Sequence, residues 1–325
     1  DIVVNVNDPN AGPKVAGVGP GGRLISYFET HHRCRVLGLP CAWHQCAERS
    51  HHQQGDARRE PDAVCGRGLR AVLGRQRAAA SDVSRFHQAR HHVIGQHGLE
   101  GVPLDTISRD SRPFASYKAF SEQLVQQGYV VFAPQNPYRG GDEFRVLQRM
   151  SNPLGRTLFS LIVEQHRQLL NWLQTLPQVN ADQIAFYGLS YGGKTAMRVP
   201  PLLQQYRVAI CSGDFTDWPR TISANDERFS YVFTGEYEIP EWNLAHLANY
   251  AELARLMSPR PFMVEAGYKD GGQPAELVAA EFAKVRRHYD RLGISERAEL
   301  EFFDGPHTIH GVGTFRFLRK HLLGE

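Results

Sequence analysis

The sequence lacks both a long apolar stretch and a strong charge of either sign. None of its apolar runs approaches the roughly 18–20 residues that a membrane-spanning helix needs, so we expect no membrane partner. The formal net charge of the 325 residues is only +3, which gives no reason to expect a nucleic acid as a partner. The length is sufficient for a full α/β core with insertions, and the sequence leaves the oligomeric state open.

Cysteine is scarce and unevenly placed. Of the five cysteines, Cys211 lies alone on a predicted strand, and the other four crowd one segment: Cys34, Cys41, Cys46 and Cys65. This usage does not identify the redox compartment. No secretory signal is visible, and the chain starts with Asp1 instead of Met. Localisation therefore stays open, and a secreted or periplasmic chain whose signal has been removed is compatible with the sequence.

Residues 31–91 differ in composition from the rest of the chain. They are rich in histidine and arginine, contain no lysine and show no sustained helical or strand periodicity. Cys41, His44 and Cys46 are metal-ligand types, but their spacing fits no common zinc pattern, so we predict no metal site. The remaining interpretations are a disordered insertion and a stretch translated out of frame. Residues 1–91 thus form a predicted N-terminal segment of irregular composition, with a strand-like run at 23–28 expected in an N-terminal β-ribbon or at a sheet edge.

From residue 92 onward, short apolar strands alternate with amphipathic helices, including single helices expected over 114–127 and 157–175. This alternation predicts an α/β domain over 92–325, with a mostly parallel sheet and helices on both faces. After the sixth strand, residues 214–257 form an insertion that we expect to lie over the site as a lid or a substrate wall. Its Trp218, Tyr237 and Trp242 are candidate substrate contacts, because aromatic rings with polar edges suit carbohydrate or aryl groups. The alternative is that these rings only pack on the body.

The most informative motif is GLSYGG at residues 188–193. It follows the strand-like run IAFY and precedes a helix, so Ser190 stands at a sharp strand–turn–helix bend. This setting is typical of the nucleophile elbow of α/β-hydrolases. Side chains at Gly188 and Gly192 would clash where the helix passes close to the strand. The pentapeptide alone is weak evidence, and three further features support it.

The first supporting feature is the loop QHGLEG at residues 96–101, at the end of a predicted strand. In α/β-hydrolases such a loop supplies one N–H group of the oxyanion hole, and the residue after the nucleophile supplies the other. Here these donors are the backbone N–H groups of Leu99 and Tyr191. We expect His97 to shape this loop and not to act as the base.

The other two features are an acid and a base after later strands. Asp270 follows the predicted strand 261–267, and its role would be to fix the tautomer of a histidine. His307 follows the predicted last strand and would accept the Ser190 proton. Glu265 and His310 are the competing acid and base. The order serine, aspartate, histidine is the chain order of α/β-hydrolases.

These motifs resemble the dienelactone hydrolase and acetyl xylan esterase group of α/β-hydrolases. The similar stretches, between residues 92 and 323, are QHGLEG, YVVFAPQNPYRGGD, IAFYGLSYGGKTA, SPRPFMVEAGYKDG and FFDGPHTIHGVGTFRFLRKHL. The resemblance implies an α/β-hydrolase fold, a Ser190–Asp270–His307 triad, no cofactor and hydrolysis of carboxylic esters. Dienelactone hydrolases carry a cysteine nucleophile, whereas position 190 is serine, which favours an ester deacylase. A small-molecule or carbohydrate ester is the expected substrate.

Two other functions stay open at this point. A peptidase of the prolyl oligopeptidase type would use the same fold and the same three residues. A non-catalytic protein on a hydrolase scaffold is the second alternative. The candidate triad argues against it, and the irregular segment 31–91 argues for it.

Overall fold

The structure is a computed structural model that describes residues 2–5, 24–27, 90–176, 179–234 and 240–325. The metal-site, disorder and frame-shift interpretations of residues 31–91 concern positions that lie almost entirely outside these ranges. Within the described ranges, no helix is both long and apolar enough to cross a membrane. The same residues contain no group of three or more His, Cys, Asp or Glu side chains arranged to hold a metal ion.

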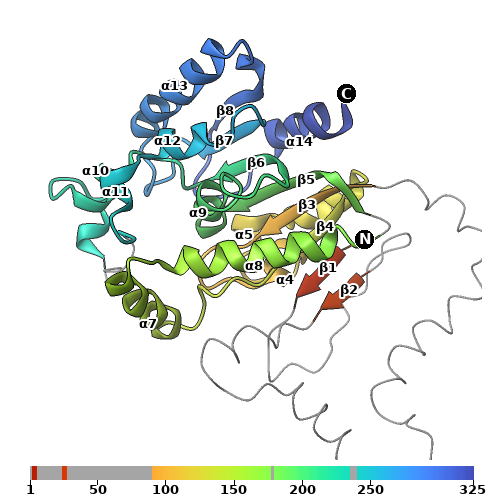
Figure 1. Cartoon of the computed structure of the whole chain (residues 1–325), viewed down its shortest axis with the longest axis horizontal. Helices are drawn as coiled ribbons and strands as arrows, with labels where there is room; N and C mark the ends of the chain where they lie inside the picture. Colours follow the sequence, from red (N-terminus) through yellow and green to blue (C-terminus); the bar gives the residue numbers. More distant parts are fainter. Residues whose placement is uncertain (1, 6–23, 28–89, 177–178, 235–239) are drawn as a thin grey trace, which may run out of the picture. The chain divides into compact units, whose positions relative to one another are not determined.

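An eight-stranded sheet forms the centre of the described part of the chain (Figure 1). Its spatial order is β2-β1-β4-β3-β5-β6-β7-β8, and every neighbouring pair runs parallel. The strands are β1 (Ile2–Asn5), β2 (Leu24–Tyr27), β3 (Arg90–Gln96), β4 (Val130–Ala133), β5 (Val179–Leu189), β6 (Tyr206–Ser212), β7 (Phe262–Gly267) and β8 (Ala298–Phe303). Of the strand-like run predicted at 23–28, the described residues 24–27 form the edge strand β2, which agrees with the sheet-edge alternative. The carboxyl ends of β5 to β8 meet along one rim, where open α/β sheets place their sites.

Helices cover both faces of the sheet, because successive strand residues point to opposite sides. Ile94 and Phe186 face one core, formed with α8 (Leu158–Leu173), α9 (Tyr191–Arg198), α12 (Tyr250–Arg255) and α13 (Ala275–Arg291). Val93 and Tyr187 face the other core, formed with α6 (Phe120–Gln126) and α14 (Val312–Leu318). The remaining α-helices are α4 (Pro103–Ile107), α5 (Phe114–Tyr117), α7 (Asp142–Ser151), α10 (Trp218–Ser223) and α11 (Leu244–Leu247). The predicted α/β-hydrolase architecture is confirmed.

The helix predicted over 114–127 is interrupted. Lys118 and Ala119 adopt left-handed backbone conformations with φ of 54° and 49°, which separates α5 from α6. Tyr117, just before the break, is buried, and its hydroxyl accepts the Gly98 N–H at 2.7 Å. The prediction of one continuous helix was therefore wrong, and a tertiary hydrogen bond near the sheet rim accompanies the break.

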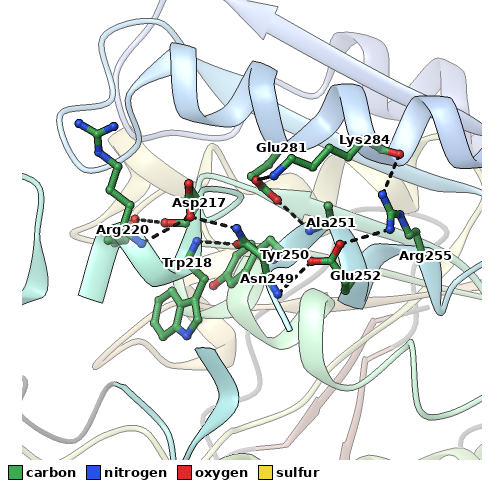
Figure 2. A network of polar contacts seen from close by, with 11 residues as sticks. Asp217, Trp218, Arg220, Asn249, Tyr250, Ala251, Glu252, Arg255, Glu281 and Lys284 are labelled. Carbon is green, nitrogen blue, oxygen red and sulfur yellow. Dashed lines mark hydrogen bonds and ion pairs between the residues drawn. The ribbon is translucent and has the colours of Figure 1, made fainter. Parts of the chain in front are cut away.

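The insertion after β6 is fastened to the body by polar contacts at its base (Figure 2). Asn249, before α12, accepts the N–H of Trp218 at 2.8 Å and donates to Asp217 at 2.9 Å. Glu281 of α13 accepts the Ala251 N–H at 3.3 Å. These contacts join the two ends of the insertion to each other and to α13.

The interior also contains a neutral histidine whose burial makes stability pH-dependent. His166 of α8 has no exposed surface, and its Nδ1 lies 2.6 Å from the Tyr206 hydroxyl. Burial lowers the pKa of His166 from 6.5 to about 3. Its contribution to stability is therefore complete above pH 6.5 and is lost progressively as the pH falls below 6.5.

We predict that the free energy of unfolding at pH 5 is lower than at pH 7.5 by about 2 kcal/mol through His166 alone, because the unfolded chain binds the proton. Denaturant unfolding at both pH values measures this difference. His166→Phe should reduce the pH-dependent loss by that amount, whatever its effect on stability at pH 7.5. Tyr206→Phe, which keeps the histidine, serves as the control. An unchanged difference in His166→Phe would contradict the assignment.

Candidate active site

Ser190 lies at the turn between β5 and α9 in a conformation that residues other than glycine rarely adopt. Its φ is 63° and its ψ is −120°. The Ser190 N–H donates to the Ser212 carbonyl at 2.9 Å, and the Ser190 carbonyl accepts the Lys194 N–H at 2.8 Å. The neighbouring strand and the first turn of α9 thus hold the strained residue from both sides.

The glycines of the motif are required by close backbone contacts. A Cβ at Gly188 would lie 2.6 Å from the Gly192 carbonyl carbon, and a Cβ at Gly192 would lie 2.5 Å from the Gln96 oxygen. Both distances are shorter than any real Cβ contact. The expectation that side chains would clash at positions 188 and 192 is confirmed. These contacts bring α9 against both β5 and the end of β3.

Asp270 and His307 form a hydrogen-bonded pair on the loops after β7 and β8. His307 Nδ1 lies 2.6 Å from Asp270 Oδ2, and the carboxylate is nearly buried while the imidazole is 41% exposed. Burial by itself lowers the pKa of His307, but the hydrogen bond and charge of Asp270, together with the charge of Asp214, outweigh it and raise that pKa above 6.5. The exposed side of the imidazole can exchange protons with a ligand.

The turn after β6 connects the serine to this pair. Gly213 has a φ of 59°, and a Cβ there would lie 2.9 Å from His307 Cε1. The preceding residue, Ser212, accepts the Ser190 N–H. Positions 190, 270 and 307 therefore meet at one rim of the sheet. The described residues contain no hydrogen bond between the Ser190 hydroxyl and the His307 ring, a contact that often tightens only when substrate binds.

The loop after β3 is oriented by His97. Its Nε2 accepts the Asn136 N–H at 3.3 Å, so its Nδ1 carries the proton and donates to the Gly98 carbonyl at 2.8 Å. The Gly101 N–H donates to the same carbonyl at 3.1 Å. Because the C=O and N–H of one trans peptide point in opposite directions, these bonds fix the direction of the Leu99 N–H. Burial lowers the pKa of His97 to about 4, which keeps the ring neutral.

The Leu99 N–H differs from its neighbours in this loop. The Gly98 N–H donates to Tyr117, and the Glu100 N–H donates to the Tyr138 carbonyl at 3.0 Å. No acceptor for the Leu99 N–H is found among the residues that the structure describes. A Cβ at Gly98 would lie 3.0 Å from Ser190 Cβ, so the loop directly adjoins the serine. The second predicted donor belongs to Tyr191, the first residue of α9.

The competing acid and base have other partners. The Glu265 carboxylate accepts bonds from hydroxyl and backbone N–H groups and does not contact the His307 ring. The His310 ring stacks on Phe303 at 4.5 Å and pairs with Glu301 at 3.1 Å. Asp270 and His307 are therefore the acid and base candidates that the geometry pairs.

The aromatic candidates of the insertion have different environments. Trp218 is 1% exposed and stacks on Tyr250 at 5.5 Å, so its burial favours the packing alternative over a substrate contact. Trp242 is 54% exposed and is available to a ligand. Tyr237 lies outside the described residues.

Sequence reasoning missed a buried charge cluster between α9 and the insertion. Lys194 Nζ lies 3.4 Å from Asp214 Oδ1 and 4.0 Å from the centre of the Trp218 ring. Arg198 donates to Glu241 at 2.7 Å. Burial lowers the pKa of Lys194 and raises that of Asp214. The sequence did offer one signal, because Lys194 and Arg198 lie four residues apart on the helix that follows Ser190. Their acidic partners are distant in the sequence, so the ion pairs could not be predicted from it.

A model of the prolyl oligopeptidase family matches residues 115–319, more than half of the chain. The chain belongs to the prolyl oligopeptidase family. It is therefore a member of a hydrolase family, one that sequence analysis had named as an alternative. The Bacillus subtilis (strain 168) protein named as the hydrolase YtaP is 26% identical over 165 residues, which are 49% of this chain and 53% of that protein. The chain thus spans about half the length of this curated relative.

Solved structures share the fold of this prolyl oligopeptidase family member at low identity. A carbohydrate esterase family 15 glucuronoyl esterase from Caldicellulosiruptor kristjansonii is 20% identical, with a TM-score of 0.56 over 75% of this chain and 71% of that one. A Bacteroides fragilis NCTC 9343 protein named as an acetyl xylan esterase is 17% identical, with a TM-score of 0.53 over 67% of this chain and 60% of that one. These likenesses agree with the predicted α/β-hydrolase fold.

We predict that Gly192→Ala lowers the free energy of unfolding by about 3 kcal/mol, because the new methyl group forces the Gln96 backbone away from α9. Thermal and denaturant unfolding measure the loss. Gly271→Ala is the matched control, since a Cβ there meets nothing within 4 Å and its φ is not left-handed. Equal stability of the two variants would contradict the close packing at the elbow.

Proposed function

We propose that this protein is a serine carboxylic-ester hydrolase with Ser190 as nucleophile, His307 as base and Asp270 as the acid that orients the base. The observation that carries the proposal is the meeting of a strained serine, a carboxylate-bound imidazole and an oriented backbone N–H group at one rim of the sheet. Each feature has a local cause in the structure, and together they supply the parts that acyl transfer needs. The proposed catalytic domain is residues 92–325.

Acylation would begin with attack of Ser190 Oγ on the ester carbonyl carbon. His307 Nε2 takes the hydroxyl proton, while its Nδ1–H remains bonded to Asp270. The negative charge that develops on the carbonyl oxygen is stabilised by the N–H groups of Leu99 and Tyr191. His307 then returns the proton to the departing alcohol oxygen, which leaves an acyl group on Ser190.

Deacylation would repeat these steps with water. His307 takes a proton from the water molecule as its oxygen attacks the acyl carbon, and gives the proton back to Ser190 Oγ when the acid leaves. Both half-reactions need a neutral His307. Because its pKa is raised above 6.5, activity should fall on the acid side as the pH decreases through that raised value.

An acylated carbohydrate or another small ester is the proposed substrate. The names of the two solved structures, glucuronoyl esterase and acetyl xylan esterase, support a carbohydrate ester. The exposed ring of Trp242 on the insertion is suited to contact a sugar face. The proposal assigns no cofactor, because the side chains and backbone groups named above complete the reaction.

A prolyl-specific peptidase is the second candidate, and the match to the prolyl oligopeptidase family favours it. The same three residues would attack an amide carbonyl, and His307 would protonate a leaving amine. The two candidates differ in the bond cleaved and not in the machinery, so only substrates can separate them. A non-catalytic protein on this scaffold is the third possibility, and loss of Ser190 would then change nothing.

We predict that Ser190→Ala abolishes hydrolysis of p-nitrophenyl acetate, with kcat falling by at least about 10⁴-fold, because the acyl-enzyme can no longer form. Unfolding curves that match those of the unchanged protein establish that the fold is retained. Retained turnover in Ser190→Ala would contradict the assignment.

The same preparations should be assayed on acetylated xylan oligosaccharides and on an acyl-prolyl p-nitroanilide. A kcat/KM that is higher for the acetyl esters supports the esterase. A higher value for the prolyl amide would replace the esterase proposal with the peptidase.

A further inference from the structure

Glu265 is a fully buried carboxylate that the proposed mechanism does not use. It lies on β7 with 0% exposure. Its oxygens accept bonds from three hydroxyl groups and two backbone N–H groups: Tyr187 at 3.0 Å, Ser212 at 2.8 Å, Thr314 at 2.9 Å, His310 N–H at 3.1 Å and Gly311 N–H at 2.7 Å. All of these groups can donate, so the site suits an ionised, acceptor-only carboxylate.

The donors to Glu265 come from both halves of the candidate site. Tyr187 lies on β5, three residues before Ser190. Ser212 ends β6, and its carbonyl is the acceptor of the Ser190 N–H. One carboxylate therefore bonds to β5, which leads into the Ser190 turn, and to β6, which accepts a hydrogen bond from that turn.

The other donors belong to the chain that follows His307. The N–H groups of His310 and Gly311 point to Glu265, and Thr314 is in the first turn of α14. Gly311 has a φ of 81°, a left-handed conformation in which its N–H reaches the carboxylate at 2.7 Å. The loop that carries His307 is thus held at its carboxyl end by the same group that contacts β5 and β6.

We propose that Glu265 is a positioning residue that sets the distance between the His307 loop and the Ser190 turn. It touches neither the substrate nor the reacting atoms, and it acts through the N–H groups of His310 and Gly311. This inference rests on the proposed hydrolase function. Replacement by glutamine turns one acceptor oxygen into an NH₂ group that faces other donors, so part of the loop attachment is lost while side-chain volume is kept.

Glu281 offers a matched control. It is a buried glutamate of α13, 1% exposed, and it also accepts a backbone N–H, from Ala251 at 3.3 Å. Its other partner is the Lys284 ammonium group. Glu281→Gln therefore removes a buried carboxylate of the same kind without touching the His307 loop.

The experiment compares Glu265→Gln and Glu281→Gln with the unchanged protein in p-nitrophenyl acetate hydrolysis, thermal unfolding and the pH profile of kcat. A displacement of the His307 loop by about 1 Å should lower kcat about 100-fold in Glu265→Gln with KM within about twofold, and should move the acid limb of the profile. Glu281→Gln should lose thermal stability but keep kcat and the acid limb.

If Glu265→Gln does not fold, Thr314→Val provides the second test. It removes a single hydroxyl donor and keeps both the carboxylate and the side-chain shape, and we expect kcat to fall about three- to tenfold with an unchanged KM. A Glu265→Gln variant that folds and keeps kcat, or a folded Thr314→Val with unchanged kcat, would overturn the positioning role. If the unsubstituted protein shows no Ser190-dependent activity, the proposed function is overturned, and this inference is overturned with it.

Discussion

The site depends on a backbone contact and not on any single side chain. α9 passes so close to β5 and to the end of β3 that no Cβ fits at Gly188 or Gly192. This approach holds Ser190 in its left-handed conformation and places it beside the loop that begins at His97. The strain of order 1–3 kcal/mol that such a conformation costs is offset by the packing of the surrounding sheet. The proposed nucleophile is therefore preorganised by the fold itself.

Polar groups under the rim extend this rigidity to the loops. Glu265 joins the ends of β5 and β6 to the chain after His307, and His97 fixes the peptide that carries the Leu99 N–H. The ion pairs that Lys194 and Arg198 form with Asp214 and Glu241 bind α9 to the insertion. The insertion, for which a lid or a substrate wall was predicted, is fastened at its base by buried charges and by the contacts around Asn249.

Local sequence patterns were sufficient to predict the parallel sheet from residue 90 onward, the elbow and the pairing of Asp270 with His307, because each depends on residues close in the chain or on strand ends that must meet. The short strand β1 was not predicted. Local patterns were insufficient where a feature depends on contacts between residues that are distant in the sequence. The break at Lys118 accompanies a hydrogen bond from Gly98 to Tyr117, and the partners of Lys194 lie in another segment. Trp218 reads as a polar-edged aromatic suited to a ligand, yet cation–π packing with Lys194 and Arg198 accompanies its burial. The sequence favoured Asp270 over Glu265, and the hydrogen bonds of the two carboxylates agree with that choice.

The proposed function depends on the activation of Ser190 as a nucleophile by the surrounding fold. Reaction with a fluorophosphonate tests this most directly, because only an activated serine attacks the reagent at neutral pH. Mass spectrometry of the proteolysed adduct should place the phosphonyl group on Ser190, in the peptide that contains GLSYGGK, with no adduct in Asp270→Asn over the same interval. A protein that stays unmodified, or that carries the group at another residue, would contradict the account.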